Sequence, residues 1–499
     1  MGLGLCLSGL AVGPLSAQTV AEDAGARGAG APAFLFDDPW VRLRALFLAD
    51  GTGGGDETVD PGLPPPGAEA VQGDGPARGE AAGLPAQLQA QEAEAGGLPG
   101  QYRAQGFERR LETVADRRRA ELDPAGLKMG TFTLFPEVQI SGSSTDNVFT
   151  TATGKKSDTI VALRPSFALR SDWRRHALIL AGEGEWGIYG RYKSENVLRG
   201  SLAGEARADL TPFVSASLRL SIASDQEGRG SPDANAGATE PGRLLTYGAQ
   251  ASLSRRFNRL VATLRGGLAL TDYDDVELVA GGSDNNDDRD VGTNTIGLRL
   301  AYEVSPAASV YGDLEFDARS YRQRLDDDGF QRSSDGWRAA IGTNVEVGRL
   351  ARLDLQVGYV ARDYEDTQLA GIGAVTADGL LTWSMTPLTT LRLGAGSDVE
   401  ETTVAGASAR VTRRVVVGAD HELLRNLTLG AEVSFENQRL LSGDAVEETD
   451  TISASFGGEY RLSREAALVA RIAHEVERPD DDSGNITETV ASVGLTLRR

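Results

Sequence analysis

The chain has 499 residues, a formal net charge of −22, one cysteine and three histidines. A single cysteine excludes a disulfide-rich fold and a cysteine-based zinc site. The strong negative charge excludes the basic surface that nucleic-acid binding needs, so no nucleic-acid partner is expected. With 40% hydrophobic residues and no apolar run after position 20 that is long enough for a transmembrane helix, average composition alone suggests a soluble acidic protein.

Residues 1–17 are predicted to be a signal peptide. An apolar stretch from Leu3 to Val12 is followed by small residues that end at Ala17, which is typical of a secretory leader. Because Cys6 lies within this leader, the exported chain is expected to contain no cysteine.

Residues 18–128 are predicted to be a largely disordered periplasmic extension with short helices. Its centre, residues 51–100, is rich in Gly, Ala and Pro and contains no aromatic residue, so it cannot bury enough apolar surface to offset its conformational entropy. One helix is expected to begin at Pro39, and a second, rich in Arg and Glu, to span Tyr102 to Leu122. These helices are interpreted as solvated parts of a tether; the alternatives are docking on a periplasmic partner or entering a pore as a plug.

From Phe132 onward, apolar and polar residues alternate over long runs. One run places Trp337, Ala339, Ile341, Thr343 and Val345 at every second position. A period of two indicates strands with one apolar and one polar face. The runs are longer than globular strands, which average about five or six residues, and fit the roughly 9–11 residues that a tilted membrane-spanning strand needs.

The connections between these runs alternate between short turns and long polar loops. Eight short turns and nine long loops, one of them at 439–449, imply eighteen strands. The long loops are acidic and the short turns are rich in Arg, which is the pattern of an outer-membrane barrel with short periplasmic turns and long external loops. The predicted fold of residues 129–499 is therefore all-β, a transmembrane antiparallel up-and-down barrel of about eighteen strands (16–18); the alternative is a large soluble sandwich or propeller.

If the apolar face contacts lipid, the other face lines a pore. The candidate pore-lining residues carry both signs of charge: Arg199, Arg207, Arg299, Arg338, Arg392, Glu183, Glu205, Glu315, Glu346 and Glu432. A mixed lining favours a wide aqueous path for polar solutes over an ion-selective ring. The alternative for each residue is a cross-strand ion pair that stiffens the wall.

No catalytic constellation stands out, so the protein is not expected to be an enzyme, and neither a cofactor nor a metal site is predicted. The runs of acidic residues in the long loops suggest one further hypothesis, that these loops collect divalent cations which bridge to lipopolysaccharide phosphates. The expected partners are outer-membrane lipid and lipopolysaccharide, with polysaccharide or periplasmic export components as further candidates.

The start of the predicted barrel carries a specific set of residues. These are Phe135-Pro136-Glu137, Ser144-Thr145-Asp146-Asn147-Val148-Phe149, Lys156-Ser157-Asp158 and Arg164-Pro165. The set resembles the first two strands of a proteobacterial family of outer-membrane barrels, the putative β-barrel porin 2 family, and the resemblance covers about residues 131–499. It implies location in the outer membrane of a Gram-negative cell and, as in some members, a link to exopolysaccharide secretion. In one departure from outer-membrane barrels, the chain ends at Arg499 without a terminal aromatic residue.

Two functions follow as hypotheses. The first is a porin-like pore for passive diffusion or export of polar solutes, with exopolysaccharide export as one form of it. The second is a structural or adhesive barrel without transport, which binds a partner through its acidic external loops or its N-terminal helices.

Overall fold

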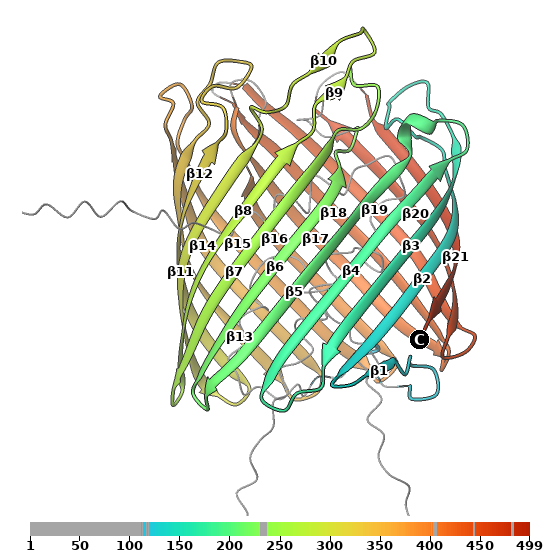
Figure 1. The fold of residues 1–499 in the computed structure, drawn as a ribbon, viewed down its shortest axis with the longest axis vertical. Helices are drawn as coiled ribbons and strands as arrows, with labels where there is room; N and C mark the ends of the chain where they lie inside the picture. Colours follow the sequence, from blue (N-terminus) through green and yellow to red (C-terminus); the bar gives the residue numbers. More distant parts are fainter. Residues whose placement is uncertain are drawn as a thin grey trace, which may run out of the picture.

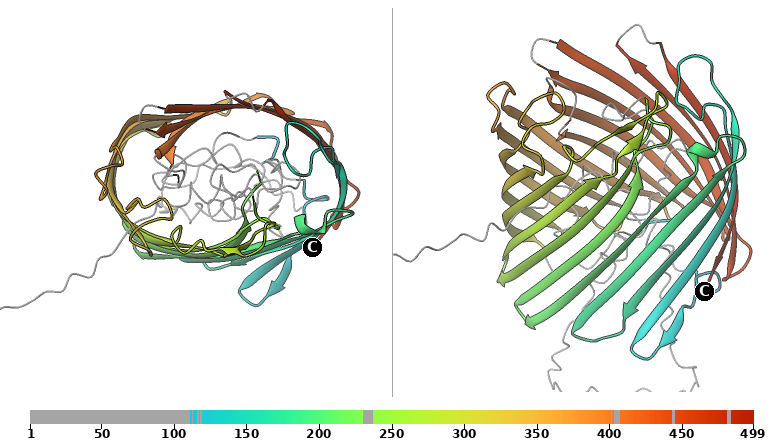
Figure 2. Two further views of the ribbon diagram at one scale, coloured as in Figure 1. Left: turned by 90° about the horizontal axis from the view of Figure 1, so that it is seen from above. Right: turned by 45° about the horizontal axis from the view of Figure 1, so that its top comes forward.

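The computed structural model describes residues 111, 113–115, 117, 119–229, 237–400, 402, 407–442, 445–480 and 484–499. The predicted signal peptide, the first predicted helix and the Gly-rich linker lie outside these residues. The described chain forms one closed antiparallel barrel with strongly tilted strands (Figure 1). Seen along its axis, the barrel is oval (Figure 2). No helix in the described part of the chain is long and apolar enough to cross a membrane.

The wall consists of eighteen strands in chain order. They are β2 (Phe132–Thr145), β3 (Asp158–Ser171), β4 (His176–Tyr189), β5 (Val197–Thr211), β6 (Val214–Gln226), β7 (Arg243–Phe257), β8 (Leu260–Tyr273), β11 (Val291–Ser305), β12 (Ala308–Tyr321), β13 (Ser334–Val347), β14 (Ala351–Tyr364), β15 (Ile372–Thr386), β16 (Thr389–Glu400), β17 (Ala407–Leu424), β18 (Leu427–Ser442), β19 (Ala445–Arg461), β20 (Ala466–Pro479) and β21 (Ile486–Arg498). Each strand pairs with the next, and β2 pairs with β21 to close the ring. Closure satisfies the backbone polar groups of every strand, as a lipid environment requires.

Short elements decorate the two ends of the wall. At the end with the short turns, β1 (Leu127–Met129) forms a hairpin with the start of β2. At the opposite end, the 3-10 helix η4 (Lys193–Glu195) and the small hairpin of β9 (Val276–Glu277) and β10 (Ser283–Asp284) belong to the long loops (Figure 1). The two ends are called the short-turn end and the long-loop end below.

The predicted strand number and the alternation of short and long connections are confirmed, with one correction. The expected loop at 439–449 is wrong, because β18 continues to Ser442 and β19 begins at Ala445. Polar side chains support each other across this hairpin: the Nδ2 of Asn437 donates to Glu448 Oε1 at 2.7 Å and to Asp450 Oδ1 at 2.8 Å. Polar cross-strand pairs of this kind stabilise a sheet without an apolar face, which is why a polar sequence here is strand and not loop.

The two faces of the wall differ as the alternation predicts. On β11, the side chain of Leu298 is 42% exposed on the outer face, whereas the next residue, Arg299, is 3% exposed on the inner face. Apolar side chains stay exposed on the outside because lipid, not protein, covers them. The inner face carries Ser, Thr, Gly and most of the charged residues, so the wall is built to separate lipid from a polar interior.

Candidate functional site: the lumen wall and the short-turn mouth

A buried charge network of the inner wall joins β8, β11 and β12. Arg265 Nη2 lies 2.6 Å from both Asp313 Oδ1 and Glu315 Oε2, and Arg299 Nε lies 2.6 Å from Asp313 Oδ2. The Arg299 guanidinium also lies over the ring of Tyr311, at 4.3 Å from its centroid. All four charged side chains are at most 7% exposed. Two arginines and two carboxylates thus neutralise each other within one buried cluster.

Further pairs continue around the wall. Arg338 on β13 reaches Asp398 on β16 at 2.6 Å, across two intervening strands. Arg392 on β16 pairs with Asp420 on β17. On the other side of the barrel, Glu185 on β4 accepts from Arg164 at 2.7 Å and from Arg199 at 2.6 Å. Contacts that skip a strand require side chains on the concave inner face, where neighbouring strands converge.

All ten predicted pore-lining residues lie on strands of this wall, but only some of them meet. The network above brings Arg299 and Glu315 together through Asp313 and Arg265. The remaining residues are distributed around the ring: Arg207 pairs with Asp209 at 3.0 Å, Glu183 accepts from Ser201, and register places Glu205 opposite Arg219, Glu346 opposite Arg352 and Glu432 opposite Gly418.

A second candidate site is the mouth at the short-turn end, where residues 111–123 contact the wall. We call the described residues of this range the mouth segment. Viewed from above, it lies within the outline of the barrel (Figure 2). The described residues at the end of the second predicted helix form turns, at Val114–Ala115 and at 120–122, and not a helix. That prediction is therefore wrong for this part of the segment.

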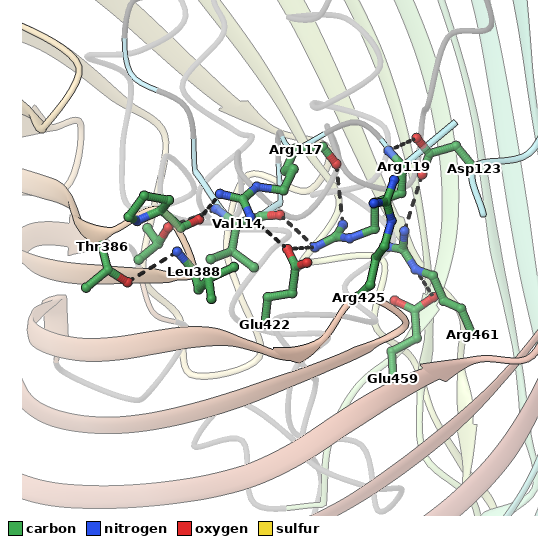
Figure 3. A network of polar contacts seen from close by, with 12 residues as sticks. Val114, Arg117, Arg119, Asp123, Thr386, Leu388, Glu422, Arg425, Glu459 and Arg461 are labelled. Atoms are coloured by element: carbon green, nitrogen blue, oxygen red, sulfur yellow. Dashed lines mark hydrogen bonds and ion pairs between the residues drawn. The ribbon is translucent and has the colours of Figure 1, made fainter. Parts of the chain in front are cut away.

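Charged contacts fasten the mouth segment to the wall (Figure 3). Arg119 Nη2 lies 2.8 Å from Glu422 Oε2, and Asp123 Oδ1 lies 3.3 Å from Arg461 Nη1. Arg119, Asp123 and Arg461 are each only 2% exposed. Burial lowers the pKa of the Arg119 guanidinium, as does the neighbouring Arg461, whereas Glu422 raises it. A buried charge is costly unless it is paired, so these pairs compensate the burial of Arg119, Asp123 and Arg461 at the mouth.

The mouth segment crosses several strands at one rim. Val114 N donates to Thr390 Oγ1 at the start of β16, Arg119 reaches Glu422 at the end of β17, and Asp123 reaches Arg461 at the end of β19. Turn residues add Arg425, which pairs with Glu121, and Arg464, which donates to Ala120 O at 2.6 Å. The segment is therefore a strap along the inner rim. Its Arg- and Glu-rich composition was the only sequence signal for it.

Comparison with protein families identifies the fold. The model of the family described as Putative beta-barrel porin 2 matches residues 119–499. The chain belongs to this family. The match begins at Arg119, within the mouth segment, and extends to the last residue. The protein is thus a porin-like outer-membrane barrel.

Solved structures with similar barrels share little sequence with this porin-family chain. The outer membrane protein opdK from Pseudomonas aeruginosa has 14% identity and a TM-score of 0.40, with 73% of this chain and 99% of that chain covered. The FrpB iron transporter from Neisseria meningitidis has 7% identity and a TM-score of 0.43, with 69% and 62% covered. A comparison with curated proteins finds no match.

Residues of the porin 2 motif tie the first loop to neighbouring strands. Asn147 is fully buried, and its Nδ2 donates to Thr151 O and to Thr487 O, both at 2.9 Å. Asp146 Oδ1 accepts from Thr489 N at 2.7 Å, and Thr145 Oγ1 donates to Glu488 at 2.6 Å. These contacts bridge β2 to β21, the seam at which the barrel closes. The structure places these motif residues at the seam and not in the pore.

The other motif residues support the same corner. Asp158 accepts backbone hydrogen bonds from Thr159, Arg191 and Tyr192, and the ring of Phe149 packs against Tyr192 with centroids 4.9 Å apart. Pro136 opposes Phe167 and Pro165 opposes Val138 across the β2–β3 pair, while Ser157 is exposed just before β3. At the C-terminal end, Leu497 is the last exposed apolar residue on the outer face.

The three histidines lie apart on the wall. His176, His421 and His474 each make a hydrogen bond to the neighbouring strand, with Asp209 N, Thr389 Oγ1 and Thr489 Oγ1, respectively. Within the described residues, no group of three or more His, Cys, Asp or Glu side chains could hold a metal ion.

Proposed function

We propose that the protein is an outer-membrane pore through which polar solutes pass by diffusion or are exported. The supporting observation is the two-faced wall, apolar outside and charged inside, closed by eighteen strands. Barrels of 16–18 strands are wide enough for an aqueous channel. A wall of this composition offers hydrogen bonds to a polar solute at every level.

The inner charges are largely paired, which bears on selectivity. In the β8–β11–β12 network, two guanidiniums face two carboxylates. Such a wall has dipoles and donors but no ring of one sign, so weak selectivity between anions and cations is expected. Uncharged hydrophilic solutes, including sugars, are the favoured cargo of this proposal. Export of exopolysaccharide, which the family resemblance implies, is its finer form.

The proposed orientation places the short-turn end in the periplasm and the long-loop end outside the cell. Short periplasmic turns and long external loops are the rule in outer-membrane barrels. This orientation would place the extension in the periplasm, because the mouth segment contacts the wall at the short-turn end.

A structural or adhesive role is the second candidate, and the long loops favour it. Glu195 pairs with Arg229 at 2.7 Å, and Glu227 pairs with Arg289 at 2.5 Å; these four residues connect three different loops. Both carboxylates are less than 7% exposed. Loops braced in this way offer a fixed surface that a partner could bind.

Planar-bilayer recording of the full chain distinguishes the two candidates. The pore predicts discrete conductance steps with little dependence on the sign of the permeant ion, and liposome swelling in small neutral sugars. The same chain unfolded by heat is the control. If the barrel is folded, as its heat-modifiable mobility shows, and yet gives neither conductance steps nor liposome swelling, the pore is contradicted. Loss of secreted polysaccharide on deletion of the protein, with restoration by the wild-type chain, tests the export form.

A further inference from the structure

One sector of the outer face, formed by β17, β18 and β20, carries arginines where the strands emerge from the apolar region. Arg413, Arg439 and Arg478 share the parity of the exposed side chains of Val415, Phe435 and Ile472, respectively, and therefore point outward. Arg413 and Arg478 are exposed. We call these three residues the rim arginines.

Their height follows from the length of the apolar stretches below them. Outward positions, all apolar except His421 and His474, run from Leu423 to Val415 on β17, from Leu427 to Phe435 on β18 and from Leu468 to Val476 on β20. Each stretch is nine residues long, close to the roughly 9–11 residues with which a tilted strand crosses the hydrocarbon. The rim arginines are the first or second outward residues beyond these stretches, so they lie at the level of lipid headgroups on the long-loop side.

The side chains of the rim arginines are left without partners by the described part of the chain. None of the three makes a hydrogen bond or ion pair with another residue in the described part of the chain, and Arg439 Nε is buried without an acceptor. On the intervening strand β19, register places Glu448 opposite Arg439 and Asp450 opposite Arg478, but these carboxylates accept from Asn437 Nδ2, at 2.7 and 2.8 Å. Three guanidiniums are therefore left to meet ligands from outside.

The spacing of the rim arginines suits several phosphates and not a single ion. Register pairs Arg439 with Val411, which places Arg439 diagonally beside Arg413, at about 7–8 Å. Arg478 lies two strands further along the wall, level with Asn437, and so about 12 Å from Arg439. Long arginine side chains extend from an apolar boundary toward charged headgroups, and the planar fork of arginine fits phosphate oxygens.

Other strands at the same rim, on the β8–β14 side, carry the reverse charge. The first outward residues beyond the apolar stretches of β8, β13 and β14 are Asp272, Asp335 and Asp363. These carboxylates would repel an anionic headgroup unless a divalent cation lay between. The sector of β17–β20 differs in that three guanidiniums accompany its two carboxylates, Glu448 and Asp450, and can meet phosphate directly.

We propose that the rim arginines form a site for the phosphate groups of lipopolysaccharide in the outer leaflet. The proposal rests on the orientation given under Proposed function and specifies where the lipid partner binds. The site is independent of conduction, because all three residues face away from the lumen.

Native mass spectrometry of the full chain in detergent, with added lipid A, tests the site. The wild-type protein is expected to retain bisphosphorylated lipid A, and the variant Arg413→Gln/Arg439→Gln/Arg478→Gln to lose about tenfold to a hundredfold in affinity. The matched control, Asp272→Asn/Asp335→Asn/Asp363→Asn on the β8–β14 side of the same rim, is expected to bind no more weakly than wild type. Inorganic phosphate is expected not to compete, since it lacks the acyl chains that lie on the apolar surface.

Unchanged affinity in the arginine variant, or equal binding of dephosphorylated lipid A by the wild type, would overturn the proposal. Heat-modifiable mobility of each variant shows that the barrel is folded. If the triple variant does not fold, the single variant Arg478→Gln, at an exposed position beyond the apolar stretch, is expected to weaken lipid A binding about fivefold. Unchanged lipid A affinity in this single variant would also contradict the site. If the protein conducts but does not prefer phosphorylated lipid A, the proposed pore is retained and only the lipid site is rejected.

Discussion

The inner and outer faces of the barrel are made by alternate residues of the same strands, yet the inner face buries paired charges and the outer face exposes apolar side chains. On the inner face, Arg299 is 3% exposed and neutralised by Asp313. On the outer face, Leu298 and Leu300 on either side of it are exposed to lipid. A shift of one position along the chain thus changes the surroundings from a paired polar wall to hydrocarbon.

This difference between the two faces explains why average composition wrongly suggests a soluble protein. Each lipid-facing residue is followed by a lumen-facing one, so a membrane protein with 40% hydrophobic residues shows no long apolar run. The inner face tolerates many charges because they neutralise one another, as Arg265 does with Asp313 and Glu315. The comparison predicts that unpairing a charge inside and adding a charge outside are both costly, for different reasons.

The largest effect is expected from Arg265→Ala. The change leaves Asp313 and Glu315, both at most 7% exposed, with one arginine between them. Removing one partner of a buried charge network typically costs about 3–5 kcal/mol. Denaturant unfolding of the barrel in detergent, followed by heat-modifiable mobility, measures the loss.

Arg207→Ala is the matched control for this prediction. Arg207 pairs with Asp209 on the same inner face, but the two side chains are 27% and 29% exposed. Solvent screening limits such a pair to about 1 kcal/mol or less. Equal losses in the two variants would show that the inner charges act individually and not as buried networks.

The next effect concerns one position on the outer face. Leu218→Arg places a charge among exposed apolar residues of β6, and about 2–4 kcal/mol of unfolding free energy is expected to be lost if the position lies near the bilayer midplane. Its control is the neighbouring inner-face change Ser217→Glu, which adds a charge opposite Arg207 in place of a side chain that shares a hydrogen bond with Ser252. The control is expected to fold normally and to lower conductance by narrowing the path. The prediction fails if both variants are destabilised alike, as measured by refolding yield into lipid vesicles.

The sequence was sufficient for the strand number and for the face on which each side chain lies, because alternation is a local property. It was insufficient at 439–449, where polar residues looked like a loop. There, Asn437 donates to Glu448 and Asp450 across the hairpin, and such pairing depends on register, which composition does not reveal.

The ion-pair partners of the pore-lining residues could not be predicted from the sequence either. Arg265 on β8 meets Asp313 on β12 across β11 because the wall curves inward, and no local pattern encodes that contact. The mouth segment was predicted as a helix from its Arg and Glu content. In the structure these charges pair with Glu422 and Arg461, more than 300 residues away in sequence, so the wall and not the helix satisfies them.

The smallest expected effect tests whether inner-face pairing also holds the mouth segment. Asp123→Asn removes the charge that meets Arg461 and weakens the bond that Asp123 Oδ2 accepts from Arg119 N at 2.7 Å. The loss is expected to release the segment from the rim without unfolding the barrel, so that trypsin cleaves near Arg117 and Arg119 about tenfold faster. Single-channel conductance is expected to rise, since the strap no longer lies along the rim. Lys128→Ala, which removes an exposed pair with Asp172, should change neither measurement. Unaltered cleavage in Asp123→Asn would mean that the segment is held by its backbone contacts, such as Val114 N to Thr390 Oγ1, and that charge pairing is confined to the strands of the wall.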